Sequence, residues 1–135
     1  MKYKLVNYNK YNLTMDIDIF KAANECHSTV SEIHGIFEKY YITRNSIFFT
    51  IAEINNNKHL MQQYDEIQNC FTDLRDDHDD NMLNLIDLIH DVNGRKEINF
   101  QNINQMLNVT KWKIELLIRK LIIFSMSIMT PSIAG

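Results

Sequence analysis

Turn-forming residues are scarce in this chain, which has only three Gly and one Pro among its 135 residues. An all-β fold of many short strands needs such residues at its frequent turns, so this composition argues against one. Ile, Leu, Asn and Met are plentiful instead, and 45% of the residues are hydrophobic, which is enough for one ordinary core. We therefore expect a single domain that is mainly α, a helical bundle.

Several motif classes are also missing. The two cysteines, Cys26 and Cys70, are too few for a disulfide framework, and the first ten residues lack the apolar core of a secretory signal. The chain has no Gly-rich phosphate loop and no G-x-S-x-G element. We expect a cytoplasmic protein that is not an enzyme and carries no cofactor.

Charge is distributed unevenly along the chain. Residues 1–94 contain 8 Lys or Arg against 15 Asp or Glu, a net charge of -7, whereas residues 95–135 contain 6 against 2, a net charge of +4. The basic C-terminal third indicates that a polyanion binds there.

Apolar spacing predicts a series of short helices. Residues 1–13 show no periodicity and are expected to be a loose arm, after which Thr14 is a candidate N-cap. A single domain is expected over 14–121, with an apolar tail at 122–135. Its helices are predicted at 15–41, 44–55 (capped by Thr43), 59–74 and 82–92, with a solvated hinge at 75–81.

The stretch Ile98 to Leu121, "INFQNINQMLNVTKWKIELLIRKL", predicts a helix-turn-helix. A first helix would bury Phe100, Ile103, Met106 and Leu107, Asn108-Val109 would form the turn, and Thr110 would cap a second helix. In such a motif the second helix reads base edges in the major groove. The residues expected outside the core, and thus the candidate DNA-binding set, are Thr110, Lys111, Trp112, Lys113, Glu115, Leu116, Arg119 and Lys120. Its four cations could neutralise phosphates.

These elements resemble the winged helix-turn-helix of MarR-type regulators, especially the SarA branch. The "LNVT" turn and the I-x-x-L-I-x-x-L core of the second helix carry the resemblance, and "FEKYYITRNSIFFTIAEI" (Phe37 to Ile54) also resembles that branch. The resemblance implies a homodimeric, DNA-binding transcriptional regulator with a recognition helix at Thr110 to Leu121. It gives no operator and no small-molecule effector.

Two segments depart from the family pattern. Residues Asn56 to Asn81 look like an insertion, and Ile122 to Gly135 has no charged residue where the family has a charged β-hairpin wing. The wing is therefore expected to be missing, and the tail is too short for a membrane span. We expect the tail to be either a truncated or frame-altered end or a segment that packs in the dimer.

Two other sets of residues could carry chemistry, but a structural role is the favoured interpretation of each. "DDHDD" (Asp76 to Asp80) carries ligand types for a divalent cation, but consecutive side chains diverge, so a solvated loop is favoured and no metal site is expected. Cys26 and Cys70 could sense oxidants, but their apolar faces favour buried thiols.

Two functions follow. The first is a homodimeric regulator that binds double-stranded DNA. The alternative is a non-enzymatic helical protein-protein interaction module, or an antagonist, that has lost strong DNA binding.

Overall fold

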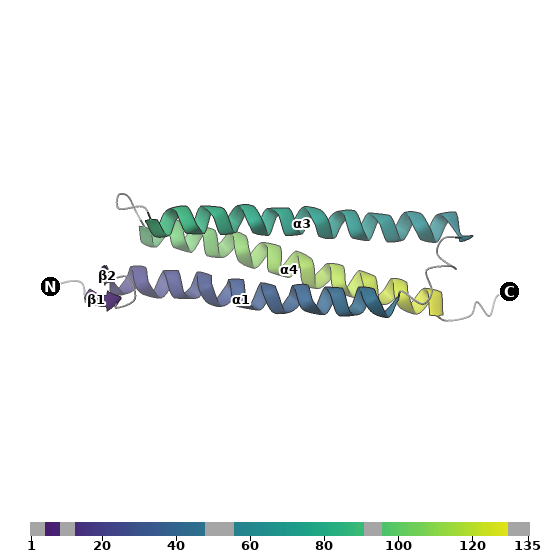
Figure 1. Ribbon diagram of the computed structural model, residues 1–135, viewed down its shortest axis with the longest axis horizontal. Helices are drawn as coiled ribbons and strands as arrows, with labels where there is room; N and C mark the ends of the chain where they lie inside the picture. The colour runs from purple at the N-terminus through teal and green to yellow at the C-terminus, as the bar shows by residue number, and fades with distance from the viewer. Residues whose placement is uncertain (1–4, 9–12, 48–55, 91–95, 130–135) are drawn as a thin grey trace.

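The computed structural model describes residues 5–8, 13–47, 56–90 and 96–129. A hairpin of two antiparallel strands, β1 (Leu5–Tyr8) and β2 (Leu13–Asp16), precedes three long helices. These are α1 (Ile17–Ser46), α3 (Lys58–His90) and α4 (Lys96–Met129). They lie side by side in an elongated bundle in which α1 and α4 run in the same direction and α3 runs in the opposite one (Figure 1). The expected mainly α helical bundle is confirmed.

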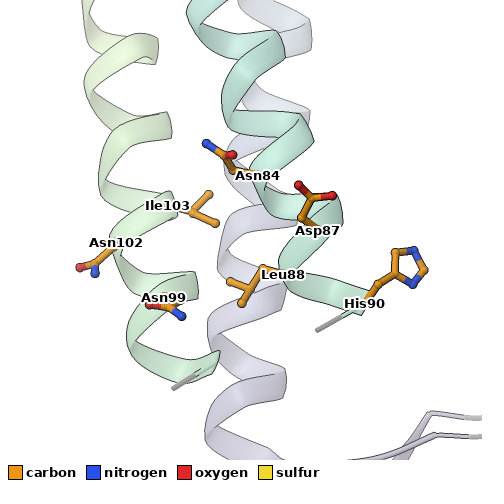
Figure 2. Close-up of a pocket in the computed structure, with 7 residues that line it drawn as sticks. All are labelled: Asn84, Asp87, Leu88, His90, Asn99, Asn102 and Ile103. Atoms are coloured by element: carbon orange, nitrogen blue, oxygen red, sulfur yellow. The ribbon is translucent and has the colours of Figure 1, made fainter. Parts of the chain in front are cut away.

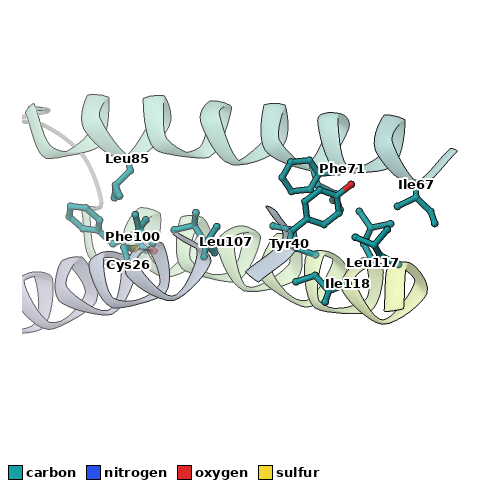
Figure 3. Packing of buried hydrophobic residues seen from close by; sticks show 14 of the residues in the cluster. Cys26, Tyr40, Ile67, Phe71, Leu85, Phe100, Leu107, Leu117 and Ile118 are labelled. Atoms are coloured by element: carbon teal, nitrogen blue, oxygen red, sulfur yellow. Dashed lines mark hydrogen bonds between the residues drawn. The ribbon is translucent and has the colours of Figure 1, made fainter. Parts of the chain in front are cut away.

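Each helix carries core residues at alternating spacings of three and four, the pattern that keeps one stripe facing its partners in a coiled coil. Helix α4 packs along both other helices. The core side chains of α4 are Phe100, Ile103, Leu107, Thr110, Ile114, Leu117, Ile118, Leu121 and Phe124. Those of α3 are Ile67, Phe71, Leu74, His78, Asn81, Leu85 and Leu88. Figure 3 shows part of this cluster between the three helices.

Aromatic side chains join α1 to α3. The Tyr40 ring stacks on Phe71 with centroids 3.7 Å apart, and Phe37 meets Phe71 edge to face at 5.6 Å. Burial raises the pKa of Tyr40 to about 12. Large planar side chains thus fill the space between these two helices.

The N-terminal part differs from expectation in two ways. Strands β1 and β2 pair where a loose arm was predicted, with Leu5 opposite Asp16 and Tyr8 opposite Leu13. Thr14 lies in β2, so it is not a helix cap, and α1 begins at Ile17.

The predicted breaks at Thr43 and at residues 75–81 are wrong. Helix α1 continues to Ser46, and the Thr43 hydroxyl donates a hydrogen bond back to the Lys39 carbonyl oxygen at 2.8 Å. The rest of the helix predicted at 44–55 lies outside the described residues from position 48 onward. Helix α3 runs unbroken through 75–81 because His78 and Asn81 take core positions while the Asp residues around them point outward.

The helix-turn-helix is also wrong, because α4 is one helix from Lys96 to Met129. Asn108 keeps helical geometry, and its side-chain amide donates to the Asn104 carbonyl oxygen at 2.9 Å. No Gly or Pro occurs between Glu97 and Met129, so nothing in that stretch forces a turn.

The apolar tail is not a separate segment. Residues 122–129 extend α4, and Phe124 is buried with its ring 5.9 Å from that of Tyr64 on α3. The proposed domain boundary at Leu121 therefore falls within a packed helix. Residues 130–135 lie outside the described residues.

Candidate interaction surface

Helix α4 has a second stripe of side chains beside its core stripe. The members repeat at alternating spacings of four and three, as core residues do, and they line hollows at the protein surface. They are Asn102, Met106, Val109, Lys113, Leu116, Lys120 and Ile123. About half of the surface of Met106 (51%) and of Val109 (50%) is exposed, and 66% of Ile123 is exposed. Apolar side chains at such spacing on an outward face are typical of a helix with one more partner to pack against.

The facing edge of α3 is polar and acidic. Its side chains in the same hollows are Gln63, Glu66, Cys70, Asp77, Asp80, Asn84 and Asp87. We call the surface formed by these residues and the second stripe of α4 the α3/α4 groove. Because α3 and α4 are antiparallel, Asp87 lies near the start of α4 and Glu66 lies near its end.

The hollows follow one another along the seam. Asn84 and Asn102 line the first two, which have volumes of about 640 and 780 Å³, and Cys70 and Lys120 line the two at the other end. Figure 2 shows Asn84 and Asp87 on α3 beside Asn102 and Ile103 on α4 in the first hollow. A long, shallow groove between two helices suits another helix better than a small molecule, which pockets enclose on most sides.

Two of the predicted DNA-contacting residues point toward the protein. Thr110 is buried in the core, with 5% of its surface exposed, although it was expected outside. Lys111 donates a hydrogen bond to Glu32 on α1, and this contact raises the pKa of Lys111. Neither is placed to enter a DNA groove.

The other six predicted residues are exposed on the outward side of α4. Lys113, Leu116 and Lys120 line the α3/α4 groove. Glu115 and Arg119 occupy other outward positions of α4. Trp112, the only Trp of the chain, is 59% exposed beside the groove stripe.

The two halves of the groove differ in charge. Toward the start of α4, Asp77, Asp80 and Asp87 line it, and no Lys or Arg among the described residues does. Toward the end of α4, Lys113 and Lys120 line it with Glu66 as the one acid. One half is therefore acidic and the other is slightly basic.

The remaining candidates form no site. Asp76, Asp77, Asp79 and Asp80 are exposed around α3 while His78 points inward, and the described residues contain no group of three His, Cys, Asp or Glu able to hold a metal ion. Burial raises the pKa of the Cys26 thiol to about 11, and its Sγ lies 3.1 Å from the Phe100 carbonyl oxygen. Cys70 is exposed, contrary to expectation. Within the described part of the chain, no helix has the length and apolarity to cross a membrane.

Sequence reasoning missed the acidic edge of α3 and three apolar members of the α4 stripe, Met106, Val109 and Ile123. The available signal was a second series at seven-residue intervals, Asn102, Val109, Leu116 and Ile123. The turn assumed at Asn108 interrupted this series, so it was not recognised.

Neither protein-family models, curated proteins nor solved structures give a match to this chain.

Proposed function

We propose that this chain is a helical protein-protein interaction module that binds an amphipathic helix in the α3/α4 groove. The observation that supports the proposal most is the row of exposed apolar side chains on α4, which no other helix of the described residues covers. The row consists of Met106, Val109, Leu116 and Ile123. A helix docked on such a row buries its own apolar face, as in other helix-in-groove complexes.

The charges of the groove define the partner further. Asp77, Asp80 and Asp87 on one side of the groove favour a partner with Lys or Arg flanking its apolar stripe. Exposed ion pairs add little affinity, so burial of the apolar row supplies most of the binding energy and the charges select and orient the partner.

The alternative proposal is the DNA-binding regulator implied by the resemblance to SarA and MarR-type proteins. Three exposed cations, Lys113, Arg119 and Lys120, still favour contact with a polyanion. The acidic residues across the groove oppose it, because Asp77 and Asp80 would repel the phosphates beside an inserted α4. The protein-binding proposal is therefore the stronger one.

A direct test uses a fluorescent peptide of about 20 residues that forms a basic amphipathic helix with Leu at core spacing. We expect its anisotropy to rise saturably as the chain is added, with a Kd on the order of micromolar. Val109→Glu together with Leu116→Glu should abolish this binding, because two carboxylates would enter the apolar row. Leu83→Glu is the matched control, since Leu83 is an exposed apolar residue of α3 outside the groove.

Duplex DNA in place of the peptide separates the two proposals. The interaction module predicts no saturable DNA binding at about 150 mM salt, where exposed charges are screened beyond about 8 Å. Absence of peptide binding, combined with DNA binding that Lys113→Ala, Arg119→Ala and Lys120→Ala weaken together, would replace the proposal by its alternative.

A further inference from the structure

Charge gives the α3/α4 groove a direction. Three carboxylates, those of Asp77, Asp80 and Asp87, line the half at the start of α4. In the half at the end of α4, Lys113 and Lys120 outnumber the one acid among the lining residues. A partner helix with one kind of charge along its whole length would be attracted by one half and repelled by the other. The groove therefore fits best a helix that is basic in one half and acidic in the other.

The charges are also spaced as a bound helix requires. Asp80 and Asp87 lie seven residues apart on α3, and Lys113 and Lys120 lie seven residues apart on α4. Seven residues span about 10 Å along a helix, which is the length of one heptad in a helix packed beside them. A partner with one charged residue per heptad on its flank can therefore meet both members of each pair.

A helix with two oppositely charged halves has a preferred order of charges. Acidic side chains stabilise the N-terminal turn of a helix and basic side chains stabilise its C-terminal turn, because both oppose the macrodipole. When the acidic half comes first, it meets Lys113 and Lys120, and the basic half that follows meets Asp80 and Asp87. The partner then runs in the direction opposite to α4 and in the same direction as α3.

The directions of the three helices favour the same arrangement. Helices α1 and α4 run in one direction and α3 alone runs in the other (Figure 1). A fourth helix antiparallel to α4 gives two helices in each direction, so that the macrodipoles of the assembly cancel in pairs. A partner parallel to α4 would instead place three helix N-termini at one end.

We infer that the partner helix in the α3/α4 groove is acidic in its N-terminal half and basic in its C-terminal half, and that it lies antiparallel to α4. This inference rests on the proposed function of the groove and adds the charge order and the direction of its occupant. The stripe from Asn102 to Ile123 is about 32 Å long at 1.5 Å per residue, so the bound helix has about three heptads.

Three peptides of identical composition test the charge order. Each has about 24 residues, Leu at core spacing and blocked ends, which remove the terminal charges. Glu precedes Lys in the acid-first peptide, Lys precedes Glu in the base-first peptide, and the two alternate in the third. In anisotropy titrations at low salt, the acid-first peptide should bind about tenfold more tightly than the alternating one, because about four exposed charge pairs together supply this factor.

A neutral groove is the matched control. The variant combines Asp77→Asn, Asp80→Asn, Asp87→Asn, Lys113→Gln and Lys120→Gln, all at exposed positions. It should bind the acid-first and alternating peptides equally, apart from the difference that the peptides' own helix stability causes. Circular dichroism checks that the variant is folded.

Paramagnetic broadening of the amide NMR signals of the wild-type chain measures the direction of the bound helix. The acid-first peptide carries a nitroxide at its N-terminus. We expect broadening near Glu66 and Ile123, which line the hollow at the end of α4. Signals near Asp87 and Asn99, which line the hollow at the start of α4, should stay sharp.

Exchanging the charges of the groove should turn the bound helix round. The variant combines Asp80→Lys and Asp87→Lys with Lys113→Glu and Lys120→Glu, so its net charge is that of the wild-type chain. The acidic half of the same labelled peptide is then attracted to the start of α4, and the broadening should move there.

The contrary outcomes are distinct. Equal affinity for all three peptides, tighter binding of the base-first peptide, broadening at both ends of α4, or a direction that the charge exchange leaves unchanged would overturn this inference. In each of these cases the groove still binds a helix. Absence of binding by all three peptides would overturn the proposed function of the groove, and this inference with it.

Discussion

His78 gives the sharpest test of the packing in the bundle. Its imidazole is buried at a core position of α3, and neither ring nitrogen has a hydrogen-bond partner among the described residues. Its ring contacts Phe37 and His34 of α1 edge to face, with centroids 5.3 and 5.6 Å apart. Burial lowers the pKa of His78 below 6.5, and the nearby His34 adds to this effect while Asp79 opposes it.

His78→Leu should stabilise the fold. Each buried polar group without a partner costs about 1 to 3 kcal/mol, and a Leu at the same core position removes both nitrogens. Loss of two edge-to-face contacts, each worth about 0.5 to 1.5 kcal/mol, offsets about 1 to 3 kcal/mol of that gain. The net increase in the free energy of unfolding should be about 1 to 2 kcal/mol, which raises Tm by about 4 to 8 °C for a chain of this length.

The same substitution should change the pH dependence. Because the pKa of His78 is lower in the folded state, the unfolded state binds the additional proton as pH falls below about 6.5. The wild-type chain therefore loses stability on acidification, by at most about 1.4 kcal/mol per pH unit from this group. The difference in the free energy of unfolding between His78→Leu and the wild-type chain should grow as the pH falls from about 7.5 to about 5.5. This range extends about one pH unit on either side of the usual pKa of histidine, so the unfolded state takes up its additional proton within it.

Urea denaturation followed by far-UV circular dichroism measures both effects, with His27→Gln, at an exposed position of α1, as the control. A His78→Leu chain that is less stable than wild type, or whose advantage stays constant with pH, would refute the buried neutral imidazole.

Three further predictions concern single positions and need only stability or labelling assays. Gly35→Ala should raise the free energy of unfolding by about 0.5 to 1 kcal/mol, because a Cβ at this exposed helical site meets nothing within 4 Å; a loss in thermal melts would contradict the helix there. Phe124→Ala should cost about 3 kcal/mol in urea titrations whereas Ile123→Ala, at an exposed site, changes stability by less than about 0.5; equal effects would argue against a packed C-terminal turn of α4. Iodoacetamide should alkylate exposed Cys70 readily but Cys26 only after unfolding, since burial raises the pKa of Cys26 to about 11; mass spectrometry that finds equal rates would contradict this burial.

The helical class was predictable from the sequence because it depends on composition and apolar spacing, which are local properties. The scarcity of Gly and Pro and the stripes through Cys26, Ile33 and Tyr40 were sufficient to predict it. The absence of strand periodicity in residues 5–16 was a weaker guide, since a two-stranded hairpin needs only four residues in each strand.

Helix lengths were not predictable by apolar spacing alone, because polar residues take core positions. His78, Asn81 and Thr110 continue the core stripes of α3 and α4, so counting only apolar residues divides each helix in two. Thr29 on α1 and Asn104 on α4 belong to the same central polar region, with the Thr29 hydroxyl 2.6 Å from Asn104 Oδ1. Polar residues at such positions help to fix the register of packed helices.

The candidate site was half predictable for the same reason. Lys113, Leu116 and Lys120 were singled out as exposed, and they do line the groove. Their neighbours Met106 and Val109 were assigned to a core and to a turn. Phe100, Ile103 and Leu107 are in the core as predicted, but Met106 and Val109 are about half exposed on the continuous helix. The acidic residues of α3 could not be assigned to the groove from the sequence, because that assignment requires knowing which helix packs beside α4.

The continuity of α4 at Val109 is the point on which the groove depends, and two substitutions there test it most directly. Urea denaturation gives the free energy of unfolding for both variants. If Val109 is an exposed residue inside a helix, Val109→Ala should leave the free energy of unfolding unchanged or raise it by up to about 0.5 kcal/mol. Val109→Pro should lower it by about 3 kcal/mol or more. A turn residue packed between two helices predicts the reverse order, with Ala costly and Pro tolerated, and that result would contradict the single helix and the interaction surface built on it.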